Sequence, residues 1–356
     1  MKQSEDIYSG NKSGFLAYGL VMFFILTIGF LGNVLTLFVL IRPEHRRRNL
    51  TPLMINLALA DIFIIIFGYP LVIQANIRGN LPESSHCIWG AFVNGTVGIA
   101  CICTLTEMSV VSYIGLKQVN RNSRFSARQN AYLIGASWMY GGLCMLPPLL
   151  GWNRFVVSAS RLSCCPDWVG RSSADTAYNL LLVFFGFFIP IVAIVICYYK
   201  IYSLVRRNIV PGNLEVQLRQ RSSKIKLVRI TATSVAAVML SWAPYSFVSL
   251  AATFTGKQVI ELWEAEIPEL LAKASVVYNP VIYVIMNSQF RASLFRILRL
   301  HRRSTVPLIV TTYRYSVRPS AGHRHNNMEQ SRGISLLKIP SAAESQILHQ
   351  VTFKNI

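Results

Sequence analysis

The chain has 356 residues, of which 53% are hydrophobic and only 14% are charged, and its mean hydropathy is +0.42. This balance excludes an ordinary soluble enzyme of the same length and indicates a membrane protein. The formal net charge of +20 would suit a nucleic-acid-binding protein, but the basic residues are concentrated in alternate gaps between apolar runs, which argues against that class.

Seven apolar stretches follow one another along the chain, and each is long enough to cross about 30 Å of hydrocarbon as a helix. We expect spans near residues 15–41, 52–76, 87–116, 132–150, 176–204, 225–254 and 265–286. The first run is too long, and begins too far into the chain, for a cleaved signal peptide. The sequence therefore predicts an all-α membrane protein without internal repeats.

The alternation of basic gaps predicts which side of the membrane each segment faces. Cytoplasmic loops carry an excess of lysine and arginine, so we expect an extracellular N-terminus over 1–14, a bundle over 15–303 and a cytoplasmic tail over 304–356. The tail is polar, and we expect it to be disordered, with serines and threonines open to phosphorylation. Before it, Phe290, Leu294 and Leu298 share a stripe beside arginines, which predicts a short amphipathic helix on the inner leaflet.

The cysteines offer one predicted disulfide on the outer side. Cys87 opens the third span at its outer end, and the pair Cys164 and Cys165 lies in the outer loop after the fourth span. Both places face an oxidising compartment, so a bridge from Cys87 to Cys164, or alternatively to Cys165, would pin the loop onto the bundle. Asn11 begins an Asn-Lys-Ser sequence in the N-terminal segment, which is an acceptor pattern for glycosylation.

A single lysine, Lys273, lies within the apolar run of the seventh span. An ammonium at that depth costs about 2.5–3.5 kcal/mol on insertion scales, so this lysine is a candidate functional residue. Its amine escapes the cost by condensing with an aldehyde, which makes it a candidate covalent anchor. The alternative, a lysine that extends to an interface, is disfavoured because about two apolar helical turns follow it.

Further marks follow in order along the spans: Gly32-Asn33, Asp61, Trp138, Pro190 with Tyr198, Trp242-Ala243-Pro244-Tyr245, and Asn279-Pro280-Val281-Ile282-Tyr283. This ordered set resembles the rhodopsin-like G-protein-coupled receptors over about residues 15–300. Lys273 narrows the resemblance to the opsins, whose seventh span carries the retinal-binding lysine at this distance before the Asn-Pro motif. The resemblance implies a seven-transmembrane helix bundle with a short eighth helix, and retinal, 11-cis or all-trans, bound to Lys273 as a Schiff base.

The resemblance also implies which residues contact the retinal. Trp242 and Tyr245 of the sixth span would lie against it, and Gly95 and Gly98 would leave room for it on the third span. An aromatic residue such as Trp242 could equally belong to the core, but ligand contact is the better interpretation beside the lysine.

An activation switch is implied at buried polar residues and helix bends, which are Asp61, Asn279, Pro280, Tyr283, Tyr198 and Tyr113. Asp61 and Asn33 need polar partners in hydrocarbon, and Asn279 is available, so we expect a hydrated polar cluster. The sequence departs from the family at Val111-Ser112-Tyr113, which lacks the usual acid and arginine. Lys224 stands where the sixth helix often has an acid, so the usual ion lock cannot form. Loss of the lock would raise activity in the dark, whereas loss of the arginine would weaken contact with the G protein.

A protonated Schiff base in an apolar pocket needs an anion beside it. The two positions that commonly supply a carboxylate in opsins are Gly90 and Ser158 here, counted from the predicted bridge. Glu269 remains, four residues before Lys273 and so about one turn, roughly 6 Å, away on the same helix face. We expect Glu269 to be the counterion, with a bound water or chloride ion completing the charge balance if it falls short. A rim carboxylate in contact with solvent is the alternative.

The function implied by the resemblance is a light-sensing receptor, and not an enzyme, in the plasma membrane. Its expected partners are retinal, membrane lipids, a heterotrimeric G protein of unknown class, and arrestin bound to a phosphorylated tail. One alternative is a retinal photoisomerase with weak or no G-protein signalling, which the altered triplet at Val111 favours slightly. Another is a receptor for a diffusible ligand in which Lys273 is incidental. The missing usual counterions resemble some cnidarian or other non-visual opsins.

Overall fold

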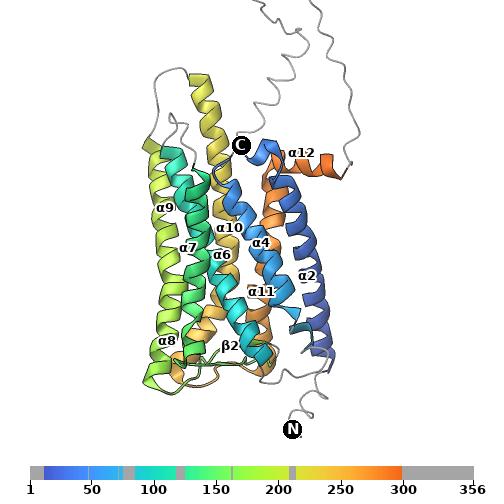
Figure 1. Ribbon diagram of the computed structural model, residues 1–356, viewed down its shortest axis with the longest axis vertical. Helices are drawn as coiled ribbons and strands as arrows, with labels where there is room; N and C mark the ends of the chain where they lie inside the picture. The colour runs from blue at the N-terminus through green and yellow to red at the C-terminus, as the bar shows by residue number, and fades with distance from the viewer. Residues whose placement is uncertain are drawn as a thin grey trace, which may run out of the picture. The chain divides into compact units, whose positions relative to one another are not determined.

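The computed structural model describes residues 12–46, 48–70, 72–74, 85–117, 125–161, 163–207 and 214–298. Within these ranges the chain forms a bundle of long helices with a two-stranded sheet at one end and a short helix lying across the other end (Figure 1). We call these the sheet end and the α12 end. The predicted glycosylation site at Asn11 and the predicted tail over 304–356 lie outside the described residues.

The bundle contains α2 (Lys12–Leu40), α4 (Thr51–Phe67), α6 (Ser85–Lys117), α7 (Ala127–Met145), a fifth rod of α8 (Ser173–Val183), η2 (Phe184–Phe188) and α9 (Ile189–Arg207), then α10 (Leu214–Thr255) and α11 (Leu262–Met286). The shorter elements are α3 (Pro43–Arg46), η1 (Pro147–Leu150), β1 (Phe155–Val157), β2 (Cys164–Pro166) and α12 (Ser288–Ile297). In the described part, 6 helices are long and apolar enough to cross a membrane, and α7 is the remaining member of the bundle. The predicted seven-helix architecture is confirmed.

Helix α7 begins and ends several residues before the span predicted at 132–150. Its start is fixed by a capping box, in which the Ser126 hydroxyl accepts from the Gln129 amide and the Gln129 side chain accepts from the Ser126 amide. At the other end Pro147 opens the 3-10 helix η1, because proline cannot supply the amide that would continue the α-helix. The hydropathy pattern alone therefore placed this span too late in the chain.

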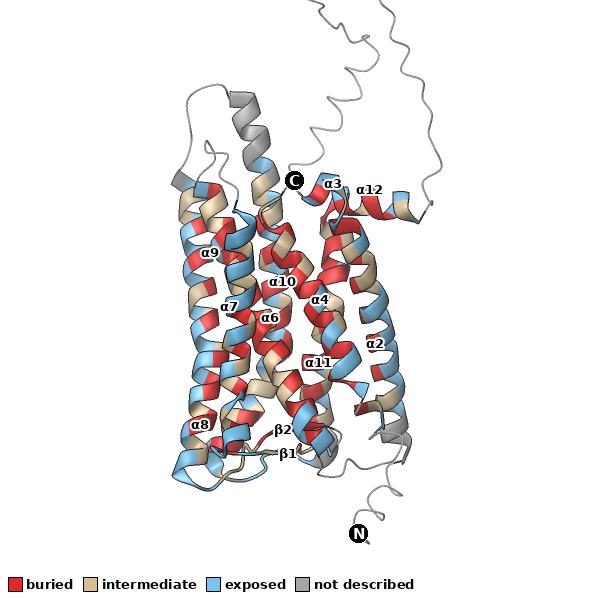
Figure 2. Ribbon diagram, viewed as in Figure 1, coloured by how far each residue is buried: buried red, intermediate tan, exposed pale blue. Residues whose placement is uncertain are grey.

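The core of the bundle is built from buried apolar residues on its helices. Figure 2 shows the buried residues distributed along these helices. Met22 and Val97 belong to a cluster toward the sheet end, and Leu53 and Phe290 belong to a cluster toward the α12 end. Large apolar side chains also cover the outside, for example Leu240 at 74% exposure. An apolar outer surface is what a helix bundle in lipid requires.

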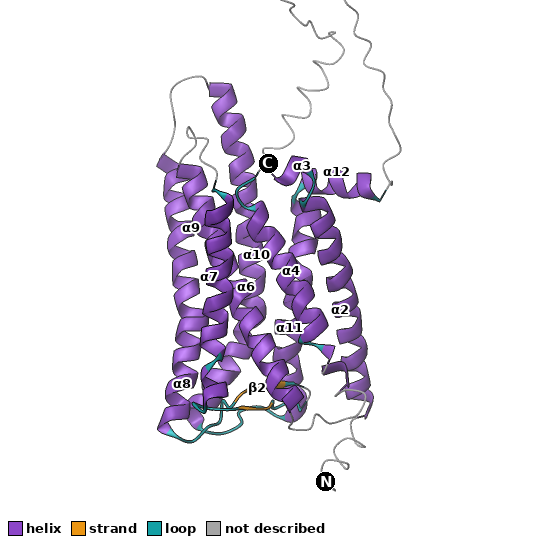
Figure 3. Cartoon of the chain, viewed as in Figure 1, coloured by secondary structure: helices purple, strands orange, loops and turns teal. Residues whose placement is uncertain are grey.

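The sheet lies across one end of the bundle and is tied to α6 (Figure 3). Strands β1 and β2 pair antiparallel, with Val157 opposite Cys164. Cys164 forms a disulfide with Cys87 at the start of α6, and their Cα atoms are 5.5 Å apart. The predicted bridge to Cys164 is confirmed, and Cys165 keeps a free thiol. The bridge fixes β2, and with it the preceding turn, against the bundle.

Helix α12 lies across the opposite end of the bundle and is amphipathic (Figure 3). It buries Phe290, Ser293 and Leu294. Asn287 caps its first turn by accepting a hydrogen bond from the Phe290 amide at 3.1 Å. The predicted short amphipathic helix is therefore confirmed, while its position on a lipid leaflet stays a prediction.

Candidate functional site

Lys273 and Glu269 form a buried ion pair on α11. The Lys273 Nζ atom lies 2.8 Å from Glu269 Oε2, and the two side chains are only 9% and 6% exposed. Residues four apart share one face of a helix, so α11 itself brings the two charges together. An ammonium or carboxylate alone would be strongly disfavoured in this place, and each neutralises the other. Neither the extended lysine nor the rim carboxylate considered from the sequence matches this burial.

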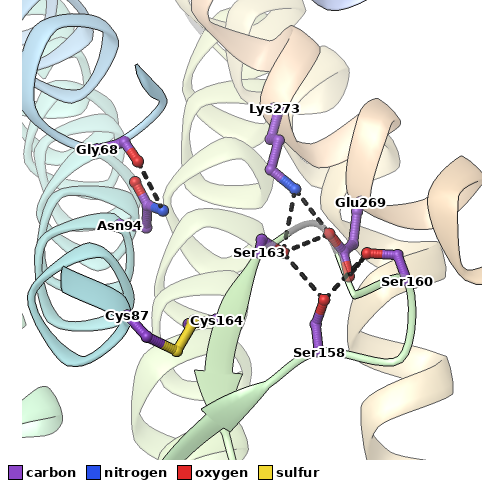
Figure 4. The surroundings of a disulfide bond; sticks show 9 residues. All are labelled: Gly68, Cys87, Asn94, Ser158, Ser160, Ser163, Cys164, Glu269 and Lys273. Atoms are coloured by element: carbon purple, nitrogen blue, oxygen red, sulfur yellow. Dashed lines mark hydrogen bonds and ion pairs between the residues drawn. A yellow bond between two sulfur atoms is a disulfide. The ribbon is translucent and has the colours of Figure 1, made fainter. Parts of the chain in front are cut away.

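Three serines of the turn between β1 and β2 surround the same carboxylate (Figure 4). Ser160 Oγ donates to Glu269 Oε1 at 3.0 Å, and Ser163 Oγ donates to Glu269 Oε2 at 2.5 Å. Ser158 Oγ lies 3.0 Å from Ser160 Oγ and 3.2 Å from Ser163 Oγ. Sequence reasoning identified Ser158 only as a position without an acid and gave no role to the other two. The available signal was the Ser-Ala-Ser-Arg-Leu-Ser run directly before Cys164.

A cavity of about 990 Å³, including its opening, borders the ion pair. It is lined by α6, α8, η2, α10, α11 and β2, and its walls are largely apolar, with Phe187, Trp242 and Tyr245 among them. Among the described lining residues, Lys273 carries the only amino group. A largely apolar cavity with one reactive amine suits a mostly hydrocarbon ligand that carries an aldehyde.

Gly95 and Gly98 lie on the wall of this cavity, but the space beside them is filled. A Cβ atom added at Gly98 would lie 2.9 Å from Trp242 Cη2, and one added at Gly95 would collide with the side chain of Met145. That these glycines leave room for the ligand stays a prediction. They allow Trp242 and Met145 to approach α6 closely, and those two side chains form the cavity wall there.

Trp242 and Tyr245 are both held by polar partners on the cavity wall. Trp242 Nε1 donates to Ser275 Oγ at 3.3 Å, and Trp168 Nε1 donates to the Tyr245 hydroxyl at 3.2 Å. The rings of Trp242 and Tyr245 meet edge to face with centroids 6.2 Å apart. The polar atoms of these aromatic side chains are thus used within the protein, and their ring faces remain for packing.

Asp61 and Asn279 meet inside the bundle, with Asn279 Nδ2 3.5 Å from Asp61 Oδ2. Asn33 does not contact either side chain; its Nδ2 donates to the backbone carbonyls of Gly29 and Val276, both at 2.9 Å. The predicted contact between Asp61 and Asn279 is present, whereas Asn33 is joined to α11 through the backbone.

The other predicted switch residues lie nearer the α12 end. Tyr113 and Tyr198 pack in one small apolar cluster, which joins α6 to α9. The Tyr283 ring lies 5.8 Å from the Phe290 ring, so it connects α11 to α12. Pro280 is inside α11. These positions fit a mechanical role, but no contact in this region identifies a switch by itself.

Lys224 makes a contact that the sequence did not suggest. Its Nζ atom donates to the backbone carbonyl of Gly115 at 2.9 Å, which ties α10 to the last turn of α6. The last carbonyls of a helix have no partners within the helix, and a cation is favourable there. The absence of the usual ion lock is thus accompanied by a lysine-to-carbonyl contact between the same two helices.

Comparison with known proteins identifies the family. The sequence matches the family described as 7 transmembrane receptor (rhodopsin family) over residues 32–283. Melanopsin of Phodopus sungorus is 28% identical over 340 residues, which cover 92% of this chain and 71% of the relative. A rhodopsin of Mizuhopecten yessoensis, named GQ-coupled, is 27% identical over 282 residues, or 76% of this chain and 56% of the relative.

The fold agrees with that assignment. The crystal structure of squid rhodopsin matches with a TM-score of 0.73 and 23% identity, covering 81% of this chain and 86% of the other. The chain therefore belongs to the rhodopsin family of seven-transmembrane receptors, and it is similar to melanopsins and rhodopsins.

Proposed function

We propose that this protein is an opsin, a light-sensing receptor that holds retinal as a protonated Schiff base on Lys273, with Glu269 as the counterion. The observation that carries the proposal is the ion pair at 2.8 Å on the wall of an apolar cavity. The melanopsin and rhodopsin relatives support retinal as the ligand and a receptor rather than an enzyme.

The residues around the cavity fit this cofactor. When bound, retinal would supply the absorption of light and a change of shape. Lys273 would anchor it, Glu269 would neutralise the positive nitrogen, and Trp242 and Tyr245 would border its chain. The Lys273 ammonium of the ligand-free protein stands in for the protonated nitrogen of the bound form.

The strength of the pair explains how the nitrogen would stay protonated. Two unit charges about 4 Å apart are worth roughly 4 kcal/mol at an effective dielectric near 20, and each ~1.4 kcal/mol changes a protonation equilibrium tenfold. At a separation of 2.8 Å, Glu269 alone can balance the charge. The chloride ion stays a prediction, and measuring the absorption band of Glu269→Gln with and without halide decides whether one takes part.

The same proposal gives the protein an orientation and partners. The sheet end would face the outside of the plasma membrane, with Asn11 glycosylated, and the α12 end would face the cytoplasm and a heterotrimeric G protein. One relative is named GQ-coupled, so that class of G protein is the first to test. Lipids would surround the bundle, and arrestin would bind the phosphorylated tail.

The test of this function is the absorption spectrum of the purified protein after incubation with 11-cis or all-trans retinal. We expect a visible band in the parent and none in Lys273→Ala. Lys257→Ala, which removes an exposed loop lysine, is the matched control and should keep the band. A Lys273→Ala protein that absorbs as the parent does would remove the proposed anchor.

A retinal photoisomerase is the second candidate, and the altered Val111-Ser112-Tyr113 triplet favours it. Both functions use the same cavity, so a spectrum does not separate them. Light-dependent nucleotide exchange on several G proteins should be measured together with the isomer composition before and after illumination. Exchange supports the receptor, whereas isomer turnover without exchange supports the isomerase.

A further inference from the structure

We propose that Ser158, Ser160 and Ser163 are positioning residues that keep Glu269 ionised and directed at Lys273. The inference rests on the proposed role of Glu269 and deepens it by naming the groups that control its charge. Its basis is the set of contacts that the turn between β1 and β2 makes with the carboxylate (Figure 4).

The direction of the hydrogen bonds favours an ionised carboxylate. A serine hydroxyl has one proton to donate, and Ser160 and Ser163 each donate theirs to a different oxygen of Glu269. Lys273 donates to Oε2 as well. A protonated Glu269 would have to donate its own proton to one of these groups and so reverse a bond. Hydrogen bonds that require the charged form stabilise that form.

Ser158 joins the other two serines into one hydroxyl cluster. Its hydroxyl lies within hydrogen-bond distance of both Ser160 Oγ and Ser163 Oγ, but the Glu269 oxygens already accept from those two serines. The Ser158 proton is therefore used within the cluster, on Glu269 itself or on one of the other two hydroxyls. In water a serine hydroxyl rotates freely, whereas here the proton positions are fixed by one another.

The backbone of the turn holds the serines in place. The Ser158 amide donates to the Ser163 carbonyl at 2.8 Å, and the Arg161 amide donates to the Ser158 carbonyl at 2.9 Å. Arg161 has a φ angle of 58°, which closes the turn in the left-handed region. The disulfide at Cys164 fixes the adjoining strand to α6. The hydroxyls are thus placed by the fold before any ligand is bound.

A carboxylate at position 158 would be incompatible with this arrangement. It would lie among the same hydroxyls that serve Glu269, and two carboxylates that share a site cannot both stay ionised at ordinary pH. Serine at this position leaves Glu269 as the only acid in the hydroxyl cluster. The negative charge comes from α11, and the loop supplies the hydrogen bonds that stabilise it.

Glu269 also lies on the wall of a second cavity of about 580 Å³, which is lined in part by Ser158, Ala159 and Gln258. This cavity is lined by α10 and α11 as well as by the loops of the sheet end, so groups from several elements face the carboxylate. The other titratable groups that interact with the pair are Tyr18 from α2, Cys165 from β2, Tyr245 from α10 and Glu266 from α11. Asp167, which interacts with Cys165, lines the same second cavity.

Burial raises the pKa of the Cys165 thiol, so this group stays neutral and adds no competing charge. Each of these neighbours is left intact in the variants below. A change in the titration of the pair can then be assigned to the hydroxyls.

The first experiment uses the retinal-free protein and the infrared bands of the Glu269 carboxyl, assigned by difference from Glu269→Gln. In Ser160→Ala/Ser163→Ala we expect protonation of Glu269 to occur about one to two pH units higher than in the parent, because two hydrogen bonds to the charged form are lost. In the retinal-loaded protein, the pH at which the visible band is lost on the alkaline side should fall by about one unit.

Two controls separate positioning from a structural role. Ser173→Ala makes the same chemical change at an exposed position of α8 that lines neither cavity, and should titrate as the parent does. Ser160→Thr/Ser163→Thr keeps both hydroxyls and should restore most of the parent titration. Thermal unfolding of each variant checks that the turn still folds.

The outcomes are distinct. Titration of Ser160→Ala/Ser163→Ala at the parent pH, while Glu269→Gln loses its visible band, overturns the role of the serines and leaves the counterion in place. A shift that threonine does not restore also overturns it, because the hydroxyls would then not be the cause. An unchanged visible band in Glu269→Gln overturns the counterion and, with it, this inference.

Discussion

The Glu269 carboxylate at the sheet end is hydrogen-bonded at both of its oxygens, whereas several side-chain oxygens toward the α12 end are buried without a partner in the described part of the chain. Both oxygens of Glu269 accept hydrogen bonds, and Lys273 is bound directly to one of them. By contrast, within the described residues the side-chain oxygens of Asn279, Tyr283 and Ser234 are buried without a hydrogen-bond partner.

This difference indicates two kinds of polar interior. A saturated network has one favourable arrangement, which suits a fixed binding site for a cofactor. Buried groups without partners gain from any rearrangement or water that supplies one, which suits a region with two packings of similar energy. We therefore expect substitutions at the sheet end to change stability and absorption, and substitutions toward the α12 end to change signalling.

The largest test of this difference between the two regions is to remove one member of the ion pair. In the retinal-free protein, Glu269→Gln should cost about 3–5 kcal/mol of unfolding free energy, because it leaves a buried ammonium unpaired. The double variant Glu269→Gln/Lys273→Met should recover most of that loss, since both charges are gone. Denaturant unfolding of the parent, both single variants and the double variant measures the coupling. Equal stability of Glu269→Gln and the double variant would contradict a saturated pair.

A smaller effect on stability is expected from Asp61→Asn toward the middle of the bundle. The contact to Asn279 is long, at 3.5 Å, and asparagine has nearly the same shape as aspartate, so the unfolding free energy should change by less than about 1.5 kcal/mol. Light-dependent nucleotide exchange should nevertheless change several-fold. An unfolding cost as large as that of Glu269→Gln would show that both regions are equally rigid.

The contact between Lys224 and the Gly115 carbonyl gives a third test. Lys224→Met keeps the length of the side chain but removes the donor, so α10 should separate from α6 more readily. The loss of about 1 kcal/mol predicts a roughly fivefold rise in nucleotide exchange in the dark. Lys226→Met, which instead removes a contact to Ser288, is the neighbouring control. If only Lys226→Met raises dark exchange, the tie between α6 and α10 is not what restrains the receptor.

The smallest effect is expected at the α12 end, where His45 Nε2 lies 3.0 Å from Ser293 Oγ. Burial, together with the nearby Arg48, lowers the pKa of His45 below its usual 6.5. The folded state therefore prefers the neutral ring, so this stabilisation is complete above pH 6.5 and is lost as the pH falls through the folded pKa. Thermal unfolding from pH 7.5 to about pH 5 should show a steeper loss in the parent than in His45→Gln.

Most of the fold was predictable because lipid-spanning helices have a strong sequence signal. Long apolar runs predicted the order of the spans. The positions of Cys87 and Cys164 predicted that a disulfide joins the outer loop to the third span. The ends of α7 were misplaced because they depend on local chemistry at Ser126, Gln129 and Pro147 rather than on hydropathy. The capping box was readable in the sequence and would have corrected the start.

The site was only half predictable, and the reason is the distance along the chain. Glu269 and Lys273 are four residues apart on one helix, so helical geometry alone placed them together. Ser160 lies 109 residues before Glu269, and only the folded turn brings it to the carboxylate. The packing of Met145 on Gly95 and of Trp242 on Gly98 was not predictable for a similar reason, since spacing gives the face of a helix but not the side chain that packs against it.

The location of the serines on the turn between β1 and β2, rather than on a helix, has a consequence for how the colour of such a pigment diversifies. Helix positions around a chromophore are packed on several sides, and an exchange there disturbs the whole bundle. A connecting turn accepts new residues far more readily. If Ser160 and Ser163 set how firmly the negative charge is held, wavelength can drift through exchanges in a hairpin, while the transmembrane scaffold stays as it is.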